Sequence, residues 1–363
     1  MSAPFRCYTE ITQQADAWHQ AVEAVLAVQK SLVATFDRLQ PDSVIFLACG
    51  SPYYLGQAAA AHWQAELRIP ARAVLGSEMA LYPDAYLPPE GSRPLLVVIS
   101  RSGATTEVLW ALEQFERRFS LERAILVTAT PGSPLTQRIP RQILLPESLE
   151  DTIAQTRSFS AMYLSVQLVG SVFARNKRLI DILRDAPERV DSVIAAWDAR
   201  LEQLITAAQF SKVFYLGGGA LFGVAQEASL KMTEMSLTEA FAFPFLESRH
   251  GPRAIIDAQT LVVGLFGQNT HAHEQKVLAE LQHEQQAQTI ALLPANLPTV
   301  PDAITRITMG VAWPDALQGL VYLPVVQLMA YYRAVAKGEN PDESRNLVPF
   351  VTLNDEEQQA QSQ

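Results

Sequence analysis

The stretch VVISRSGATTEV, residues 97–108, decides how the whole chain is interpreted. An apolar, partly β-branched run stops at Ser100, and a turn rich in hydroxyl groups leads into a helical pattern that begins near Thr106. A short buried strand followed by a turn and a helix is the repeating unit of parallel α/β sheets. Ligands of such sheets bind at the carboxyl ends of the strands, so this turn is a candidate ligand site.

Similar apolar runs occur on both sides of this stretch and form two series. The first series is SVIFLACG, ARAVLGSE, PLLVVISRSG, AILVTAT and RQILLPE; the second is KVFYLGGG, TLVVGLFGQ, QTIALLPA and AITRITMG. The opening segments of the two series, VIFLACGSPYYLGQAAA and VFYLGGGALFGVAQEAS, share the order strand, glycine turn, helix. This self-similarity at long spacing predicts two copies of one α/β unit.

The chain therefore divides into four predicted parts. We expect an N-terminal helical segment at 1–40, with one or two helices over residues 10–40, a first domain at 41–195, a second at 196–340, and a tail at 341–363. The join falls in helical sequence with no flexible linker, which indicates that the two halves pack rigidly.

Composition excludes several classes of function. The 363 residues carry a formal net charge of −10, which argues against nucleic acid or an anionic membrane as the main partner. Cys7 and Cys49 suit neither a disulfide framework nor a metal site. The N-terminus lacks a signal-peptide pattern, and the apolar segment 319–332 is short for a membrane span. We expect a cytoplasmic protein.

The turn after the strand at 94–99 has the chemistry of an anion site. Helix N-termini present unpaired backbone N–H groups, and the hydroxyls of Ser100, Ser102 and Thr105 add donors. Gly103 allows a ligand to approach the backbone. The alternative is an ordinary N-cap, for which one hydroxyl suffices. No G-x-x-x-x-G-K-[ST] motif occurs, and GGGALFG at 217–223 lacks dinucleotide-binding spacing.

A second group of polar residues lies at 227–257. Glu227, Lys231 and Glu234 fall on one helix face, among apolar neighbours. The alternative is a solvated, salt-bridged face, but carboxylates on a buried helix can act as proton-transfer bases. His250 follows in the turn SRHGP, and HAHE at 271–274 is weak support for a metal, so we expect no metal and no cofactor.

Three motifs together resemble a known family. SRSGATTE after a strand, the turn ACGSPYYLG, and EASLKMTEMSLTEAF with ESRHGP resemble the double sugar isomerase (SIS) domain proteins. These include the isomerase half of glucosamine-6-phosphate synthase and stand-alone phosphosugar deaminases, isomerases and deglycases. The resemblance spans roughly residues 5–353 and implies an α/β fold of two tandem SIS domains, each a mostly parallel sheet flanked by helices.

The resemblance also implies roles for individual residues. It assigns phosphate binding to Ser100, Arg101, Ser102 and Thr105, and sugar binding to Gly50, Ser51, Ile153, Gln155 and Val348. Glu234 matches the base that moves a proton between C1 and C2, and Lys231 matches a supporting lysine. His250 matches a ring-opening histidine that reaches across from the neighbouring subunit, which implies a homodimer.

Two departures from the synthase limit the reaction. This sequence lacks the glutamine-hydrolysing domain, and Pro349 stands where the synthase has the lysine that forms an imine with the ketose. We therefore expect a phosphosugar isomerase and deaminase acting on an amino-hexose 6-phosphate. The alternatives are a deglycase of glycated-amine 6-phosphates, a plain isomerase, or a non-catalytic phosphosugar sensor.

Overall fold

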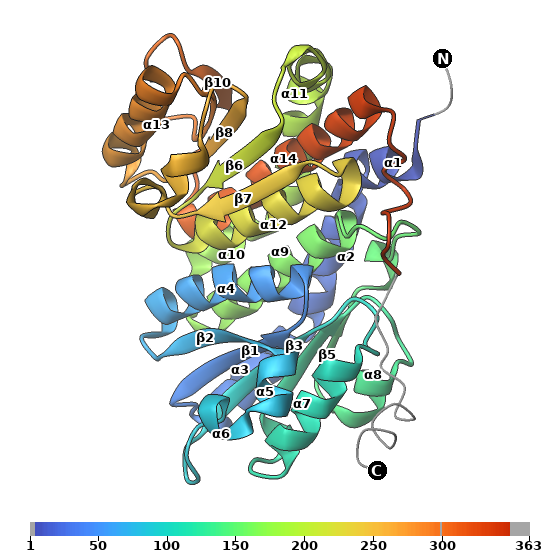
Figure 1. Cartoon of the computed structure of the whole chain (residues 1–363). Coiled ribbons are helices and arrows are strands. Elements are labelled where there is room, and N and C mark those ends of the chain that lie inside the picture. Colours follow the sequence, from blue (N-terminus) through green and yellow to red (C-terminus); the bar gives the residue numbers. More distant parts are fainter. Residues whose placement is uncertain (1–3, 298–299, 349–363) are drawn as a thin grey trace, which may run out of the picture.

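The computed structural model describes residues 4–297 and 300–348, which are organised around two parallel sheets (Figure 1). The first sheet has the strand order β2-β1-β3-β4-β5, and every neighbouring pair is parallel. Its strands are β1 (Ser43–Ala48), β2 (Ala71–Leu75), β3 (Pro94–Ile99), β4 (Ala124–Thr128) and β5 (Gln142–Leu144).

The second sheet repeats the topology of the first. Its order is β10-β9-β8-β6-β7, again parallel throughout, so counting from β6 gives the same 2-1-3-4-5 arrangement. Its strands are β6 (Lys212–Leu216), β7 (Glu239–Phe243), β8 (Thr260–Leu265), β9 (Gln288–Leu293) and β10 (Thr305–Thr308). The predicted fold class, α/β with two tandem domains of one kind, is confirmed.

Helices fill the space between the sheets and cover their outer faces (Figure 1). In the first half they are α1 (Arg6–Thr12), α2 (Gln14–Ala27), α3 (Gln29–Leu39), α4 (Ser51–Leu67), α5 (Gly76–Leu81), α6 (Pro83–Tyr86), α7 (Thr106–Glu116), η1 (Leu121–Arg123), α8 (Pro134–Arg138), η2 (Pro146–Ser148), α9 (Arg157–Phe173) and α10 (Lys177–Arg184). The second half has α11 (Ala186–Ala207), α12 (Ala220–Ser236), η3 (Glu247–His250), η4 (Pro252–Ile255), α13 (His271–Gln285) and α14 (Asp315–Lys337).

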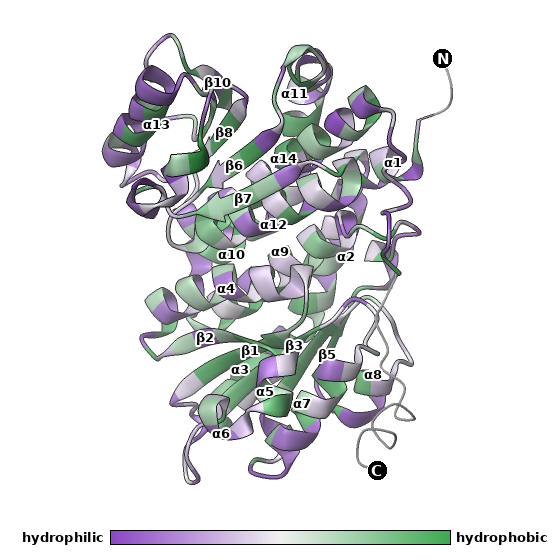
Figure 2. Cartoon of the chain, in the orientation of Figure 1, coloured by the Kyte–Doolittle hydropathy of each residue, from purple (hydrophilic) through white to green (hydrophobic). Residues whose placement is uncertain are grey.

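One apolar core joins the two halves. Successive side chains of a strand point to opposite faces, so Val44 and Phe46 of β1 enter the large cluster between the sheets, whereas Ile45 and Leu47 pack toward α7. The large cluster also takes residues from β6, α12 and α14. Figure 2 shows the strands of both sheets as mostly hydrophobic. Because the halves share this core, α12 of the second half is held directly against α4 of the first.

Helix α14 is long and apolar enough to cross a membrane by length and composition alone. Most of it is buried inside the protein, between α11 and α12. It is therefore accounted for as a core helix of the fold.

The structure differs from the sequence-based expectations in two details. Residues 10–40 contain α2 and α3, in line with the expected one or two helices, but a further helix, α1, begins earlier at Arg6, and β7 was not expected as a strand. Strand β7 pairs with β6 at a sheet edge and is half-buried apart from the exposed Glu239. It contains no β-branched residue, and alanine and glutamate are depleted in strands, so its strand signal is weak. The predicted domain boundary between 195 and 196 falls inside α11, and the domain limits stay predictions.

Candidate functional site

A cavity of about 320 Å³ opens at the carboxyl ends of β1 and β3. In the order 2-1-3-4-5 the connections from these two strands run to opposite sides, which makes their junction the ligand site of open parallel sheets. Of the twelve site residues predicted from the sequence, eleven line this cavity: Gly50, Ser51, Ser100, Arg101, Ser102, Thr105, Ile153, Gln155, Lys231, Glu234 and Val348. A volume of this size suits a small ligand.

Residues 100–105, here called the phosphate loop, connect β3 to α7. Ser100 Oγ accepts a hydrogen bond from the amide of Gly103 at 3.1 Å, and Ser102 Oγ accepts one from Ala104 at 3.2 Å. Thr105 is the N-cap residue of α7, yet its side chain makes no capping hydrogen bond. A hydroxyl that accepts can still donate, so the loop keeps O–H donors for a ligand beside the positive end of the α7 dipole. Thr105 therefore does not cap α7 through its own hydroxyl, whereas Ser100 and Ser102 bond amides within the loop, and anion binding here stays a prediction.

Gly103 is required by the shape of the phosphate loop. Its φ of +61° is in the left-handed region, and a Cβ built there would lie 2.1 Å from Ser133 Oγ. Gly50, at the N-cap of α4, has a similar φ of +61° and nothing within 4 Å of a built Cβ. Gly103 allows the phosphate loop to pack closely against Ser133. Gly50 leaves open space beside the turn that precedes α4, next to the cavity.

A buried cluster of charges on α12 forms the opposite wall. The Lys231 ammonium contacts the Glu234 carboxylate, lies 3.5 Å from Glu227 Oε1, and donates to Ser51 Oγ at 3.2 Å. The side chains of Lys231 and Glu227 are 1% and 0% exposed, whereas Glu234 is 18% exposed and reaches the cavity. The surface salt-bridge alternative is therefore wrong for this helix face.

Burial and neighbouring charges shift the titration of this cluster. Burial raises the pKa of Glu227 to about 8, and the nearby Lys231 limits that rise. Burial alone would lower the pKa of Lys231, but Glu227 and Glu234 outweigh it and the pKa of Lys231 is raised. Lys231 thus stays a cation in contact with the Glu234 carboxylate at the edge of the cavity.

Two segments without regular structure complete the cavity. The loop at residues 150–156 contributes Ile153 and Gln155, and the C-terminal segment contributes Leu347 and Val348. Gln155 Oε1 is buried and has no hydrogen-bond partner among the described residues, which makes it an available acceptor for a ligand. Pro349, whose position bears on imine chemistry, lies outside the described residues.

His250 does not line the cavity of its own chain. It is an exposed residue at the end of η3, and the exposed Leu246 and Ile255 lie in the same segment. Its predicted contribution to a neighbouring subunit's site stays a prediction.

The corresponding position in the second sheet is filled by the protein itself. There the Glu274 carboxylate accepts from the Gly267 amide at 3.0 Å and from the Thr270 hydroxyl at 2.6 Å, and Asp315 accepts from the Gln268 amide at 2.7 Å. Burial raises the pKa of Glu274 to about 7. These carboxylates accept hydrogen bonds from the backbone amides of the loop after β8. The corresponding loop of the first sheet, after β3, borders the cavity, so the open site described here belongs to the first half.

Sequence reasoning missed two acidic residues at the site. Glu107, in the first turn of α7, lines the cavity, and its Oε2 is buried with no partner among the described residues. Glu150 is fully buried behind the cavity, 3.6 Å from Arg101. Glu107 ends the SRSGATTE motif, but acidic residues in a first helical turn are common, so no separate role was assigned to it. Glu150 lies seven residues before α9, and its pairing with Arg101 depends on tertiary contacts that no local pattern shows.

Comparisons with known proteins agree with this geometry. Residues 39–172 match the SIS domain family. The isomerizing glutamine–fructose-6-phosphate aminotransferase of Caldanaerobacter subterraneus subsp. tengcongensis is 28% identical over 329 residues, covering 86% of this chain and 52% of that protein. The chain thus spans about half the length of the curated relatives it matches.

Solved structures show the same fold over nearly the whole chain. The tagatose-6-phosphate ketose/aldose isomerase of Escherichia coli superposes with a TM-score of 0.85 at 24% identity, covering 96% of this chain and all of that one. The glucosamine-6-phosphate deaminase of Thermotoga maritima gives 0.70 at 25% identity, covering 92% and 100%. The second half, which the family match does not reach, is included in both similarities.

Proposed function

The chain carries a SIS domain of the kind found in phosphosugar isomerases, and we propose that it is a phosphosugar isomerase that deaminates an amino-hexose 6-phosphate. The substrate phosphate binds the phosphate loop, and the sugar chain extends toward Glu234. The observation that carries the proposal is a cavity with anion donors on one wall and a carboxylate beside a buried ammonium on the other.

The reaction follows from the position of Glu234. After the ring opens, the Glu234 carboxylate removes the C2 proton of the aldose, and the electrons move to form an enol between C1 and C2. The same carboxyl returns the proton at C1 and leaves an imine at C2, while the proton that O1 takes up from water is balanced by the one that the amine releases to water. Water then hydrolyses the imine to the ketose and ammonia, so the atoms balance without a redox step.

The remaining roles complete the proposal. Lys231 positions the Glu234 carboxylate by direct contact, and Gln155 Oε1 accepts from a sugar hydroxyl or the amine. His250 of a second copy assists ring opening, so the active form is a homodimer with two-fold symmetry. Phosphate and sugar are bound by this chain's own residues, with no metal or organic cofactor, and the protein acts in the cytoplasm.

A substrate panel in ²H₂O tests the function. Hexosamine 6-phosphates, hexose 6-phosphates and glycated-amine 6-phosphates are incubated with the wild type, the Glu234→Gln variant and the surface control Glu188→Gln. We expect ammonia release and solvent deuterium at C1 of the product with a hexosamine 6-phosphate, for the wild type and the control only.

Other outcomes identify the alternatives. Deuterium incorporation without ammonia release identifies a plain isomerase, and release of a larger amine identifies a deglycase. Tight binding of a sugar phosphate without deuterium exchange in any member of the panel refutes the enzyme and supports a sensor.

A further inference from the structure

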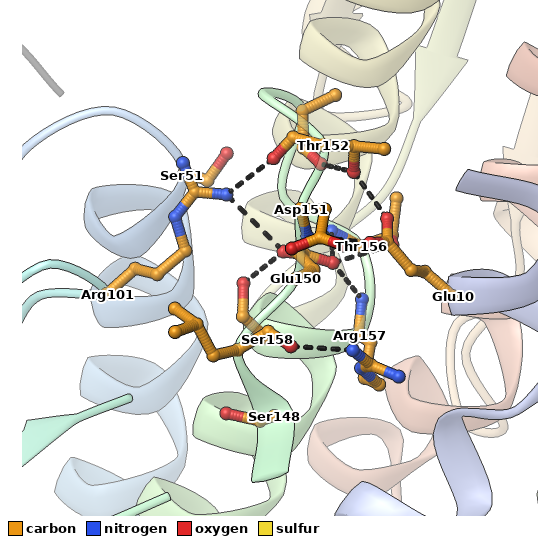
Figure 3. A network of polar contacts seen from close by, with 12 residues as sticks. Glu10, Ser51, Arg101, Ser148, Glu150, Asp151, Thr152, Thr156, Arg157 and Ser158 are labelled. Carbon is orange, nitrogen blue, oxygen red and sulfur yellow. Dashed lines mark hydrogen bonds and ion pairs between the residues drawn. The ribbon is translucent and has the colours of Figure 1, made fainter. Parts of the chain in front are cut away.

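Arg101 points from the phosphate loop toward the 150–156 loop (Figure 3). Its Nη1 donates to the carbonyl oxygen of Thr152 at 3.2 Å and lies 3.6 Å from Glu150 Oε1. The Arg101 and Glu150 side chains are 8% and 0% exposed, so this ion pair is formed away from water. Both contacts are made by one nitrogen, Nη1, and the rigid, planar guanidinium fixes the place of that nitrogen, which an ammonium on a flexible stem does less well.

Glu150 is the centre of a hydrogen-bond network that fixes the end of the same loop (Figure 3). Its carboxylate accepts from the amides of Thr156 and Arg157, at 3.0 and 2.9 Å, and from the hydroxyls of Thr156 and Ser158. These groups form the start of α9, where a negative charge is favoured. One buried carboxylate therefore joins Arg101 to the exit of the 150–156 loop.

The loop is also held from its other side. Glu10 of α1 accepts from the amide of Asp151 at 2.8 Å and from the hydroxyl of Thr152. Thr152 thus lies between Glu10, from the N-terminal helix, and Arg101, from the phosphate loop (Figure 3). The next residues along the chain include Ile153 and Gln155, which face the cavity.

We propose that Arg101 is a positioning residue that ties the phosphate loop to the 150–156 loop, rather than a group that binds the phosphate. Through Glu150 and Thr152 it holds Gln155 where its side chain meets the sugar. Binding of the phosphate group and recognition of the sugar are thereby coupled. This inference rests on the proposed binding of a sugar phosphate in the cavity.

The test uses the full chain and two probes, inorganic phosphate and sorbitol 6-phosphate. The variants are Arg101→Gln, Arg101→Lys, Glu150→Gln and the double variant Arg101→Gln/Glu150→Gln. Arg175→Gln is the matched control, because Arg175 forms an exposed ion pair with Asp37 away from the cavity. Binding is measured by calorimetry, and amide hydrogen exchange of residues 150–157 is measured without ligand.

We expect Arg101→Gln to weaken sorbitol 6-phosphate about tenfold or more while inorganic phosphate stays within about threefold. In Arg101→Gln, amide hydrogen exchange at Thr156 and Arg157 should be faster than in the wild type, because both amides donate to Glu150. Arg101→Lys, which keeps the charge but not the planar guanidinium that places Nη1, should behave like Arg101→Gln. The double variant should bind sorbitol 6-phosphate no worse than Arg101→Gln alone, because both substitutions remove the same Arg101–Glu150 ion pair.

Two results overturn the proposal. One is unchanged exchange in the loop of both Arg101 variants. The other is a loss of inorganic phosphate affinity as large as that for sorbitol 6-phosphate, with Arg101→Lys retaining both, which makes Arg101 a phosphate ligand. If the wild type binds neither probe, the proposed function fails, while the exchange measurement still decides whether Arg101 holds the loop.

Discussion

Replacing Lys231 by methionine tests how the buried charges on α12 are balanced. Methionine keeps an apolar stem of similar length but removes the ammonium that lies 3.5 Å from Glu227 and contacts Glu234. In the wild type, burial raises the pKa of Glu227 to about 8, and Lys231 opposes this rise. Without the ammonium the pKa of Glu227 rises further, so its carboxyl stays protonated above pH 8.

The sign and size of the effect follow from proton linkage. Because the folded-state pKa of Glu227 exceeds its unfolded value of 4.5, stability is fully present below pH 4.5 and is lost as pH rises. In the wild type this loss ends near pH 8; in Lys231→Met it continues. The difference in free energy of unfolding should therefore grow by about 1.4 kcal/mol per pH unit above 8, or about 2 kcal/mol by pH 9.5. At pH 6.5 the difference in free energy of unfolding comes only from the loss of the contacts to Glu234 and Ser51 and should be about 1–3 kcal/mol.

Urea unfolding at pH 6.5, 8.0 and 9.5 measures this difference from the midpoints and slopes. The double variant Lys231→Met/Glu227→Gln is the control, because it removes the titrating carboxyl and should show a constant difference from the wild type above pH 8. A destabilisation of Lys231→Met that is equal at pH 8.0 and 9.5 would refute the reasoning.

Four further predictions concern the site and the fold. Glu234→Gln should lower turnover about 10²-fold or more and leave binding of a hexose 6-phosphate within several-fold, as initial rates and calorimetry will show. Mixing Glu234→Ala and His250→Ala chains should restore part of the activity, because a hybrid dimer contains one intact site; confirmed hybrids without activity would contradict the shared site. Gly103→Ala should destabilise the chain by about 1–3 kcal/mol and weaken phosphate binding, because its Cβ would meet Ser133 Oγ at 2.1 Å, and Ser133→Gly should recover part of both losses in a thermal-shift assay with phosphate. Burial lowers the pKa of His62 to about 4, so the stability that is present above pH 6.5 is lost as pH falls toward 4. The His62→Leu variant lacks this titrating group, so its free energy of unfolding should fall by about 2–3 kcal/mol less than that of the wild type between pH 7 and 4.5, as measured by urea titration.

Local patterns in the sequence were sufficient to predict the elements and the repeat. The apolar runs predict nine of the strands, and the two glycine turns predict equivalent strand-to-helix junctions, since Gly50 and Gly219 adopt nearly the same backbone angles. Strand and helix periodicities are properties of neighbouring residues, which is why they can be read directly. The spacing of Glu227, Lys231 and Glu234 likewise places them on one helix face without any tertiary information.

Which of the two equivalent sheets carries an open site was decided only by the tertiary structure. Both have the glycine turn after their first strand, but in the second half Glu274 accepts a hydrogen bond from the Gly267 amide in the loop after β8, while in the first half the corresponding loop after β3 borders a cavity. No local pattern distinguishes a carboxylate that caps its own loop from one that faces solvent.

The assembly of the cavity also depends on contacts between distant parts of the chain. Lys231 meets Ser51 across 180 positions because α12 packs on α4, and Glu10 reaches Thr152 across 142. The sequence alone determined which side chains carry the chemistry, because residue type and local spacing set that. Their convergence required the core shared by the two halves, because only packing of elements far apart in sequence brings such side chains within hydrogen-bond distance.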